Sequence, residues 1–210
     1  MAKTPANTRE LKELKRSLKL SLLQREVIIG TILGDGCLMT SYSGDTARLQ
    51  IRHQVKCREY VDWKYSFFTR WVLTPPRLDI HNNSWFFQTV SHTDLMEIKR
   101  LFYVGRQRVI PKNIVDLLKT PLSLAMWLMD DGNGFPVYQG FRMSSYGFGL
   151  SGNKLLRRCL MKNFNLKTNI FRDKKGYQLL FPKGVAAEMY GLIKPYIVGC
   201  MKYKFAALTP

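Results

Sequence analysis

The sequence contains two nine-residue stretches of the same design, IIGTILGDG at residues 28–36 and LAMWLMDDG at residues 124–132. Each offers about two turns of apolar helix and ends in aspartate followed by glycine, the residue that most readily takes the backbone conformation that ends a helix. Gly30 and Gly34 lie four residues apart, on one helix face where another backbone could approach closely. The repeat therefore predicts two packed helices with one carboxylate at the end of each.

A single stretch of this kind also fits a buried helix followed by a common Asp-Gly turn, but its recurrence at half-chain separation favours an internal duplication. With these residues the chain resembles the LAGLIDADG homing endonucleases, whose two signature helices form the central interface and each place one acidic residue in the active site. The chain departs from the signature at Leu33, which replaces an earlier acid, and at Met126 and Asp130, where the family prefers small residues. These departures predict looser packing of the second helix.

Over residues 20–205 the chain is similar, with its motifs in the same order, to the double-motif, monomeric, intron-encoded members of the family. Further stretches that carry this resemblance are WVLTPP at 71–76, IPKN at 110–113, TPLSLA at 120–125, MDDG at 129–132 and LIKPY at 192–196. It implies an α+β fold of two pseudosymmetric αββαββα halves, whose antiparallel sheets form a DNA-binding saddle around the packed signature helices. The expected division is a basic N-terminal lead-in over 1–24, a first half over 25–104, a linker over 105–120 and a second half over 121–210.

Residue periodicity gives the same order of elements independently. In the first half we expect a strand at 47–55, a helix at 56–72, a hairpin of 77–80 with 85–91, and a helix at 94–104 with Thr93 as its N-cap. Pro111 is expected to start a short helix in the linker. In the second half we expect strands around 137–143 and 144–150, a helix at 153–164 capped by Ser151, strands at 166–173 and 177–181, and a helix at 185–197.

The charge of the chain is far from ordinary. Its formal net charge is +18 and its isoelectric point is about 10.0, which favours a polyanionic partner. A membrane-surface protein is the competing explanation, but no single amphipathic helix carries the charge. The four cysteines lack CxxC spacing, so neither a zinc site nor a disulfide framework is indicated. We expect an intracellular protein, located in a mitochondrion, a plastid or a bacterial cytoplasm according to where its host intron resides.

The strand at 47–55 has one apolar face and one polar face, and the polar face carries Arg48, Gln50, Arg52 and Gln54. Arginine and glutamine pair bidentately with guanine and adenine edges in the major groove. An ordinary solvated face is the alternative, but the high positive charge favours contact with DNA. Other candidate DNA-binding residues are Arg77, Arg142, Lys167, Arg172, Lys174 and Lys175. His53 falls on the apolar side and is interpreted as a satisfied packing residue.

The resemblance implies that Asp35 and Asp131 bind the metal. Two carboxylates brought together by packed helices repel each other unless a cation lies between them, and oxygen ligands of this kind suit Mg²⁺. We therefore expect two or more divalent ions shared by these acids. Asp130, one position earlier in the signature, is the weaker candidate, and turn capping is the structural alternative for both acids.

The resemblance also matches Arg108, Lys204 and Gln50 to family positions near the cleaved phosphate, with generic phosphate contact as the alternative. Arginine stabilises phosphate charge but carries protons poorly at neutral pH. The chain is therefore interpreted as a monomeric, site-specific homing endonuclease that breaks both strands of a double-stranded DNA site of roughly 20 base pairs by metal-dependent hydrolysis. The alternatives are an RNA maturase that assists splicing of a group I intron, and a non-catalytic DNA-binding regulator on the same fold.

Overall fold

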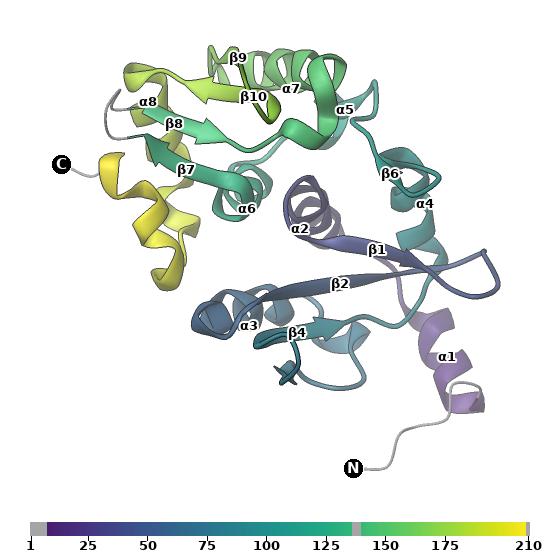
Figure 1. Ribbon diagram of the computed structural model, residues 1–210. Coiled ribbons are helices and arrows are strands. Elements are labelled where there is room, and N and C mark those ends of the chain that lie inside the picture. Colours follow the sequence, from purple (N-terminus) through teal and green to yellow (C-terminus); the bar gives the residue numbers. More distant parts are fainter. Residues whose placement is uncertain (1–7, 136–139, 209–210) are drawn as a thin grey trace.

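The computed structural model describes residues 8–135 and 140–208, and its two four-stranded sheets lie on either side of a central pair of helices (Figure 1). The first part contains α1 (Arg9–Ser17), α2 (Leu22–Leu33), β1 (Cys37–Thr40), β2 (Ala47–Gln54), α3 (Arg58–Ser66), β3 (Arg77–Asp79), β4 (Ser84–Gln88) and α4 (Thr93–Phe102). The connection contains β5 (Tyr103–Val104), β6 (Gln107–Arg108) and α5 (Ile114–Leu117). The second part contains α6 (Pro121–Asp131), β7 (Gly132–Phe135), β8 (Gly140–Met143), α7 (Gly149–Phe164), β9 (Asn169–Asp173), β10 (Gly176–Phe181), α8 (Lys183–Ile193) and a C-terminal 3₁₀ segment, Gly199–Leu208.

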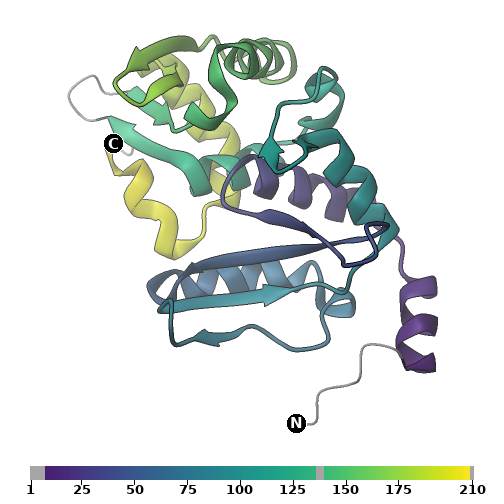
Figure 2. The ribbon, with the colours of Figure 1, turned by 45° about the vertical axis from the view of Figure 1, so that its right-hand side comes forward.

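The two four-stranded sheets have the same topology. Their strand orders are β1-β2-β4-β3 and β7-β8-β10-β9, and every pairing is antiparallel. Helices α3 and α4 pack on the first sheet, and α7 and α8 on the second. Figure 2 shows α3 running behind β2 and β4, with α2 between the two sheets. This arrangement confirms the expected α+β fold of helices and antiparallel sheets.

The sequence explains where the two central helices begin. Ser21 starts α2 and Thr120 starts α6, and each forms a capping box that satisfies the free N–H groups of the first turn. Nearly every residue from Val27 to Leu33 is apolar, and all of them are buried. Helices that are apolar on all sides belong inside a protein, so α2 and α6 form the centre of the core.

The polar and apolar faces of β2 are as predicted. Ala47, Leu49 and Ile51 are buried, whereas Arg48 and Gln54 are exposed. The hairpin of β3 and β4, the turn between β9 and β10 and the last helix also occur where the sequence indicated, although several of these elements are shorter.

Two helix boundaries in the first part differ from the predicted ones. The predicted helix at 56–72 begins with a 3₁₀ turn, and its α-helical part ends at Ser66 rather than at the prolines. The N-cap of α4 is His92, whose side chain accepts a hydrogen bond from the Asp94 N–H, so Thr93 is not the cap. The predicted end of this helix, Tyr103 and Val104, instead pairs with β6.

Three predictions in the linker and the second part are also wrong. The helix α5 starts at Ile114 and not at Pro111. The stretch 144–150 is a 3₁₀ turn leading into α7 rather than a strand, and α7 begins at Gly149, before the proposed cap Ser151. Of the predicted strand at 137–143, residues 137–139 lie outside the described part of the chain.

A search for membrane-spanning helices among the described residues finds none with the length and apolar character required.

Candidate functional site

The central helices pack so closely that two glycines of α2 have no room for a side chain. A Cβ at Gly30 would lie 2.2 Å from the Ser123 carbonyl oxygen and 2.9 Å from the Met126 Cβ. A Cβ at Gly34 would lie 2.3 Å from the Asp130 Cβ. The prediction of looser packing is therefore wrong, because the glycines of α2 leave the space that the larger residues of α6 fill.

The two signature carboxylates lie where these helices end. Asp35 follows the C-terminus of α2, and Asp131 is the last residue of α6. Both line one hollow of about 400 Å³, together with Arg108 and Ser144. Asp35 also lines a second hollow of about 700 Å³. The structure therefore brings the two predicted acids to a common site.

Both carboxyls have raised pKa values. Burial raises the pKa of Asp131 to about 7, with further contributions from the negative charges of Asp35 and Asp130. Burial also raises the pKa of Asp35, and the charge of Asp130 adds to this effect. A site that resists the charging of its own carboxylates gains free energy when a cation binds between them.

Two basic side chains contact the ends of the same helices. Arg108 donates hydrogen bonds to the carbonyl oxygens of Ile32, at 2.7 Å, and Gly34. Lys204 donates to the carbonyl oxygens of Met129, at 2.6 Å, and Asp130. These carbonyls form the negative ends of the helix dipoles, so each signature helix has one cation at its C-terminus.

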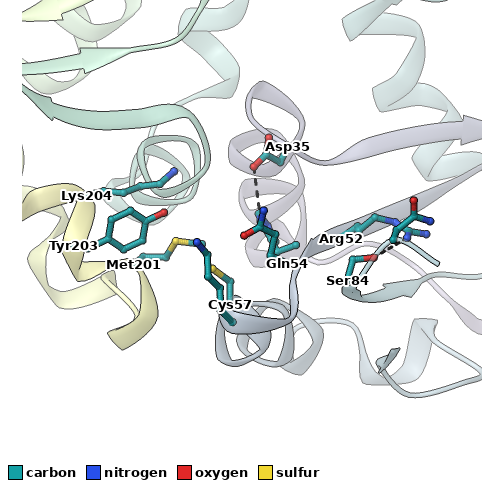
Figure 3. A pocket seen from close by; sticks show the side chains of 11 residues that line it. Asp35, Arg52, Gln54, Cys57, Ser84, Met201, Tyr203 and Lys204 are labelled. Atoms are coloured by element: carbon teal, nitrogen blue, oxygen red, sulfur yellow. Dashed lines mark hydrogen bonds and ion pairs between the residues drawn. The ribbon is translucent and has the colours of Figure 1, made fainter. Parts of the chain in front are cut away.

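Lys204 belongs to the C-terminal segment and lines the larger hollow. Figure 3 shows Lys204 and Tyr203 on one side of this hollow, Arg52 and Ser84 on the other, and Asp35 between them. Gln50, which was grouped with the catalytic candidates, lies opposite Cys37 and Gln88 in the first sheet and lines neither hollow.

Asp130 has a different environment from its neighbour. Its side chain is 0% exposed, and the equally buried Lys64 ammonium lies 3.0 Å from both of its carboxylate oxygens. Oδ2 of Asp130 also accepts a hydrogen bond from the Asp35 backbone N–H at 3.1 Å. Asp130 therefore already has its cation, and that cation is a lysine of α3.

His53 lies between the carboxylates of Asp35 and Asp130. Its Nδ1 is 3.7 Å from Asp35 Oδ2, and its Nε2 is 3.6 Å from Asp130 Oδ1. Burial lowers the pKa of His53 to about 4, so the ring is neutral at pH 7. The interpretation of His53 as a satisfied packing residue is wrong, because Nε2 is buried without a hydrogen-bond partner among the described residues.

Asp35, His53 and Asp130 offer ligand atoms within 4.8 Å of one another, a spacing that could hold a metal ion. Lys64 weakens this group as a metal site, because its ammonium already contacts both oxygens of Asp130. The pair of Asp35 and Asp131 has no such lysine between its carboxylates among the ion pairs of the described residues. The carboxylate oxygens of Asp35 and Asp131 are of the kind that a divalent cation takes as ligands.

The outer face of the first sheet gathers the polar residues predicted for DNA. The strand register puts Arg52 opposite Phe86 and Phe86 opposite Arg77. Each guanidinium carbon lies 4.6 Å from the centre of the Phe86 ring, so the two arginines are held by cation–π contacts. Arg52 also forms an ion pair with Asp79 and donates to Ser84 Oγ.

The second sheet places its predicted residues less uniformly. Arg142 lies on the face that the helices do not cover, opposite Asn133, and its guanidinium carbon is 4.2 Å from the centre of the Phe135 ring. Arg172 shares its face with Ile170, the face on which α7 packs, and contacts the Tyr177 ring. Lys167 precedes β9, and Lys174 and Lys175 form the turn between β9 and β10; all three are exposed.

Lys64 is not among the predicted site residues, although the sequence carries a signal for it. Lys64 follows Tyr60 by four residues and Val61 by three, which places all three on one face of α3, and all three are buried. A lysine on an apolar helix face and an aspartate at a signature position reserved for small residues both require a partner. Together these two anomalies predict the ion pair.

The comparisons with known proteins agree with this geometry. The model of the LAGLIDADG DNA endonuclease family matches residues 25–188. The DNA endonuclease I-ChuI of Chlamydomonas applanata is 25% identical, over 89% of this chain and 96% of the relative. The cytochrome b mRNA maturase bI2 of Debaryomyces hansenii is 26% identical, over 85% of this chain and 72% of the relative. The structure of the homing endonuclease I-WcaI bound to its DNA recognition sequence matches with a TM-score of 0.86 and 27% identity, covering 100% of this chain and 96% of that one.

Proposed function

The chain belongs to the LAGLIDADG DNA endonuclease family, and from this membership we propose that it is a site-specific homing endonuclease that breaks both strands of a long DNA target. Its resemblance to I-WcaI extends over the whole chain, and that relative is described bound to its DNA recognition sequence. I-ChuI, the relative with 25% identity, is named a DNA endonuclease. As a product of an intron gene, the protein would act in the compartment that holds the intron, an organelle or a bacterial cytoplasm.

The observation that carries the catalytic proposal is the common hollow of Asp35 and Asp131. Their carboxylate oxygens fit Mg²⁺, which prefers oxygen ligands and leaves room for phosphate oxygens. When bound, divalent ions supply charge stabilisation for the phosphate and lower the pKa of a coordinated water. The chain itself supplies the two carboxylates that hold the ions, at the ends of helices whose spacing is set by glycine contacts.

Arg108 and Lys204 are the basic residues best placed to act on the scissile phosphates. Each has further N–H groups beyond those that contact the helix carbonyls, and each lines a hollow that Asp35 also lines. Because arginine stays protonated, Arg108 would stabilise phosphate charge without transferring a proton. Gln50 would act as a DNA contact rather than as a catalytic residue, since it lines neither hollow.

Substitution of the two acids tests the catalytic proposal. Asp35→Asn or Asp131→Asn should abolish double-strand cleavage in Mg²⁺ while leaving the dissociation constant for DNA in Ca²⁺ within a few-fold. Asp116→Asn is the matched control, because Asp116 is an exposed acid on α5, and it should cleave normally. Full cleavage by either signature variant would refute the assigned roles, and specific binding with no cleavage by the unaltered protein would favour the DNA-binding regulator.

The outer faces of the two sheets are the proposed DNA interface. Base contacts are proposed for the side chains on those faces, which are Arg48, Gln50, Arg52, Gln54, Arg77 and Arg142. Phosphate contacts are proposed for Lys167, before β9, and for Lys174 and Lys175, in the turn between β9 and β10. Arg172 joins this second group, since its face is the one on which α7 packs. If one monomer follows about one turn of duplex with each half, its target spans roughly 20 base pairs.

A second candidate function is binding of intron RNA, as the name of the maturase relative suggests. The observation that favours it is a basic surface on α7, which packs on the inner face of the second sheet. Its residues are Lys154, Arg157, Arg158 and Lys162, with Lys167 beyond the helix, and they line a hollow of about 680 Å³. Arg157→Glu with Arg158→Glu should abolish binding of the intron RNA without changing DNA cleavage. Unchanged RNA binding would refute this second function.

A further inference from the structure

We propose that Lys64 and Asp130 are a positioning pair for the reaction, in which a side-chain oxygen of Asp130 fixes the backbone at Asp35 and Lys64 neutralises the buried Asp130 charge. This inference rests on the proposed role of Asp35 as a metal-binding carboxylate. Asp130 departs from the signature pattern and Lys64 lies outside the signature. Their ion pair connects α3 of the first part to α6 of the second.

The pair is built into the seam between the parts. Lys64 comes from α3 and Asp130 from α6, and both side chains are 0% exposed. The Lys64 ammonium lies 3.0 Å from both carboxylate oxygens and 4.2 Å from the centre of the Tyr60 ring. Tyr60 in turn donates its hydroxyl to the Met126 carbonyl oxygen of α6 at 3.2 Å. The Asp130 carboxylate and the Tyr60 ring therefore fix the ammonium in one place.

Asp130 transmits this fixed position to the reactive end of α2. Its Oδ2 accepts the Asp35 N–H at 3.1 Å, and the neighbouring Gly34 leaves no gap, because a Cβ there would lie 2.6 Å from the same oxygen. The Asp35 side chain is 51% exposed, and its carboxylate lies 3.7 Å from His53 Nδ1, so the position of its backbone matters for where the carboxylate lies. The hydrogen bond that the Asp35 N–H donates to Asp130 therefore helps to fix the backbone from which the Asp35 carboxylate projects.

Stability alone does not account for a pair of this kind. Buried ion pairs can often be replaced by apolar residues of similar size without loss, whereas removal of one partner strands the other charge. The signature prefers a small residue at this position, and a small residue would cost no desolvation. A positioning role explains why this chain keeps an aspartate there and a lysine opposite it.

The test compares two double variants in the full-length protein, so that neither leaves a buried charge without a partner. Lys64→Met/Asp130→Asn removes both charges but keeps a side-chain oxygen that can accept the Asp35 N–H. Lys64→Met/Asp130→Ala removes the charges and the acceptor, and it keeps the Cβ that packs on Gly34. Both should bind target DNA in Ca²⁺ within about twofold of each other and should unfold at similar temperatures.

Cleavage should separate the two variants. The asparagine variant should cleave within about threefold of the unaltered protein, and the alanine variant should cleave at least tenfold more slowly, with a higher Mg²⁺ concentration for half-maximal rate. Equal rates and equal Mg²⁺ dependence in the two variants would overturn the proposal, since a merely structural pair predicts no difference. Asp35→Asn tests the metal-binding role of Asp35 separately from the positioning pair. If that variant cleaves DNA, the role of Asp35 is refuted, whatever the double variants do.

Discussion

Gly30→Ala should separate the two central helices, and the structure allows the size of this effect to be worked out. The added Cβ would lie 2.2 Å from the Ser123 carbonyl oxygen, about 1.2 Å closer than an ordinary contact of 3.4 Å. The neighbouring atom belongs to the backbone of α6, so it cannot move away by changing rotamer. The two helices must therefore shift apart, or one of them must bend.

The expected loss of stability combines two opposing effects. Overpacking costs about 3 kcal/mol, the upper end of its usual range, when the obstacle is rigid. Alanine recovers about 1 kcal/mol of that cost, because it favours a helix more than glycine does. The net loss of about 2 kcal/mol corresponds to a melting temperature lower by about 4–8 °C for a chain of this size.

A second glycine supplies the matched control. Gly191 lies in α8, and a Cβ at this position would meet no atom within 4 Å. Gly191→Ala should therefore raise the free energy of unfolding by about 0.4–1 kcal/mol. Thermal unfolding followed by circular dichroism measures both variants. If Gly30→Ala is as stable as Gly191→Ala, the two helices are not in contact where the structure places them.

The same variant should affect cleavage more than binding. A separation of the helices displaces Asp35 relative to Asp131, and a displacement of about 1 Å at a reacting centre can cost on the order of 100-fold in rate. Gly30 is buried between α2 and α6 and is not part of the outer faces of the sheets, so the dissociation constant for DNA should change little. A loss of affinity as large as the loss of rate would show that the helix spacing orders the whole saddle.

Three further predictions concern pH, the basic residues and salt. Because the pKa of Asp131 is raised to about 7, the metal-free native protein holds a proton that the unfolded chain loses above about pH 4, so its melting temperature in EDTA should fall from pH 5 to pH 8. The melting temperature of Asp131→Asn should fall less from pH 5 to pH 8. An equal fall in the two proteins would contradict the raised pKa of Asp131. Arg108→Gln and Lys204→Met should each lower the cleavage rate on the order of 100-fold, whereas the exposed controls Arg106→Gln and Lys202→Met should not, as single-turnover kinetics would show. Affinity for the DNA target should fall by about 10³-fold or more between 50 and 200 mM salt if six or more phosphates are neutralised, and a flat salt dependence in a filter-binding assay would exclude such an interface.

Much of the fold could be predicted from the sequence, because local patterns determine it. The alternation along β2 and the apolar signature helices both have clear periods, and the structure follows them. The strand predicted at 144–150 does not form, because side-chain hydrogen bonds hold this stretch in a 3₁₀ turn. Asn153 donates to the carbonyl oxygens of Ser145, Gly149 and Tyr177, and Gly149 takes a φ of +59°.

Of the acids and their neighbours in the candidate site, only the two signature aspartates could be predicted from the repeat. Asp35 and Asp131 follow from the repeat itself, because each stands at the same place in it. The environment of Asp130 does not follow from local pattern, since Lys64 is 66 residues away in the chain. The alternation along β2 places His53 on the apolar side of the strand. That side faces both the core and the carboxylates of Asp35 and Asp130. The alternation along a strand predicts on which face a residue lies. It does not predict which residues of other elements lie next to it.

The buried lysine also limits how this protein could be recombined with its relatives. A chimaera that takes α3 from a family member without a lysine at this position would leave Asp130 charged in an apolar interface, with no counter-ion. The Glu59 carboxylate of α3 likewise accepts the Cys200 N–H of the C-terminal segment at 3.1 Å, so a second contact would be lost. Engineered target specificity by exchange of halves should therefore succeed only when α3 is inherited together with α6 and the C-terminal segment.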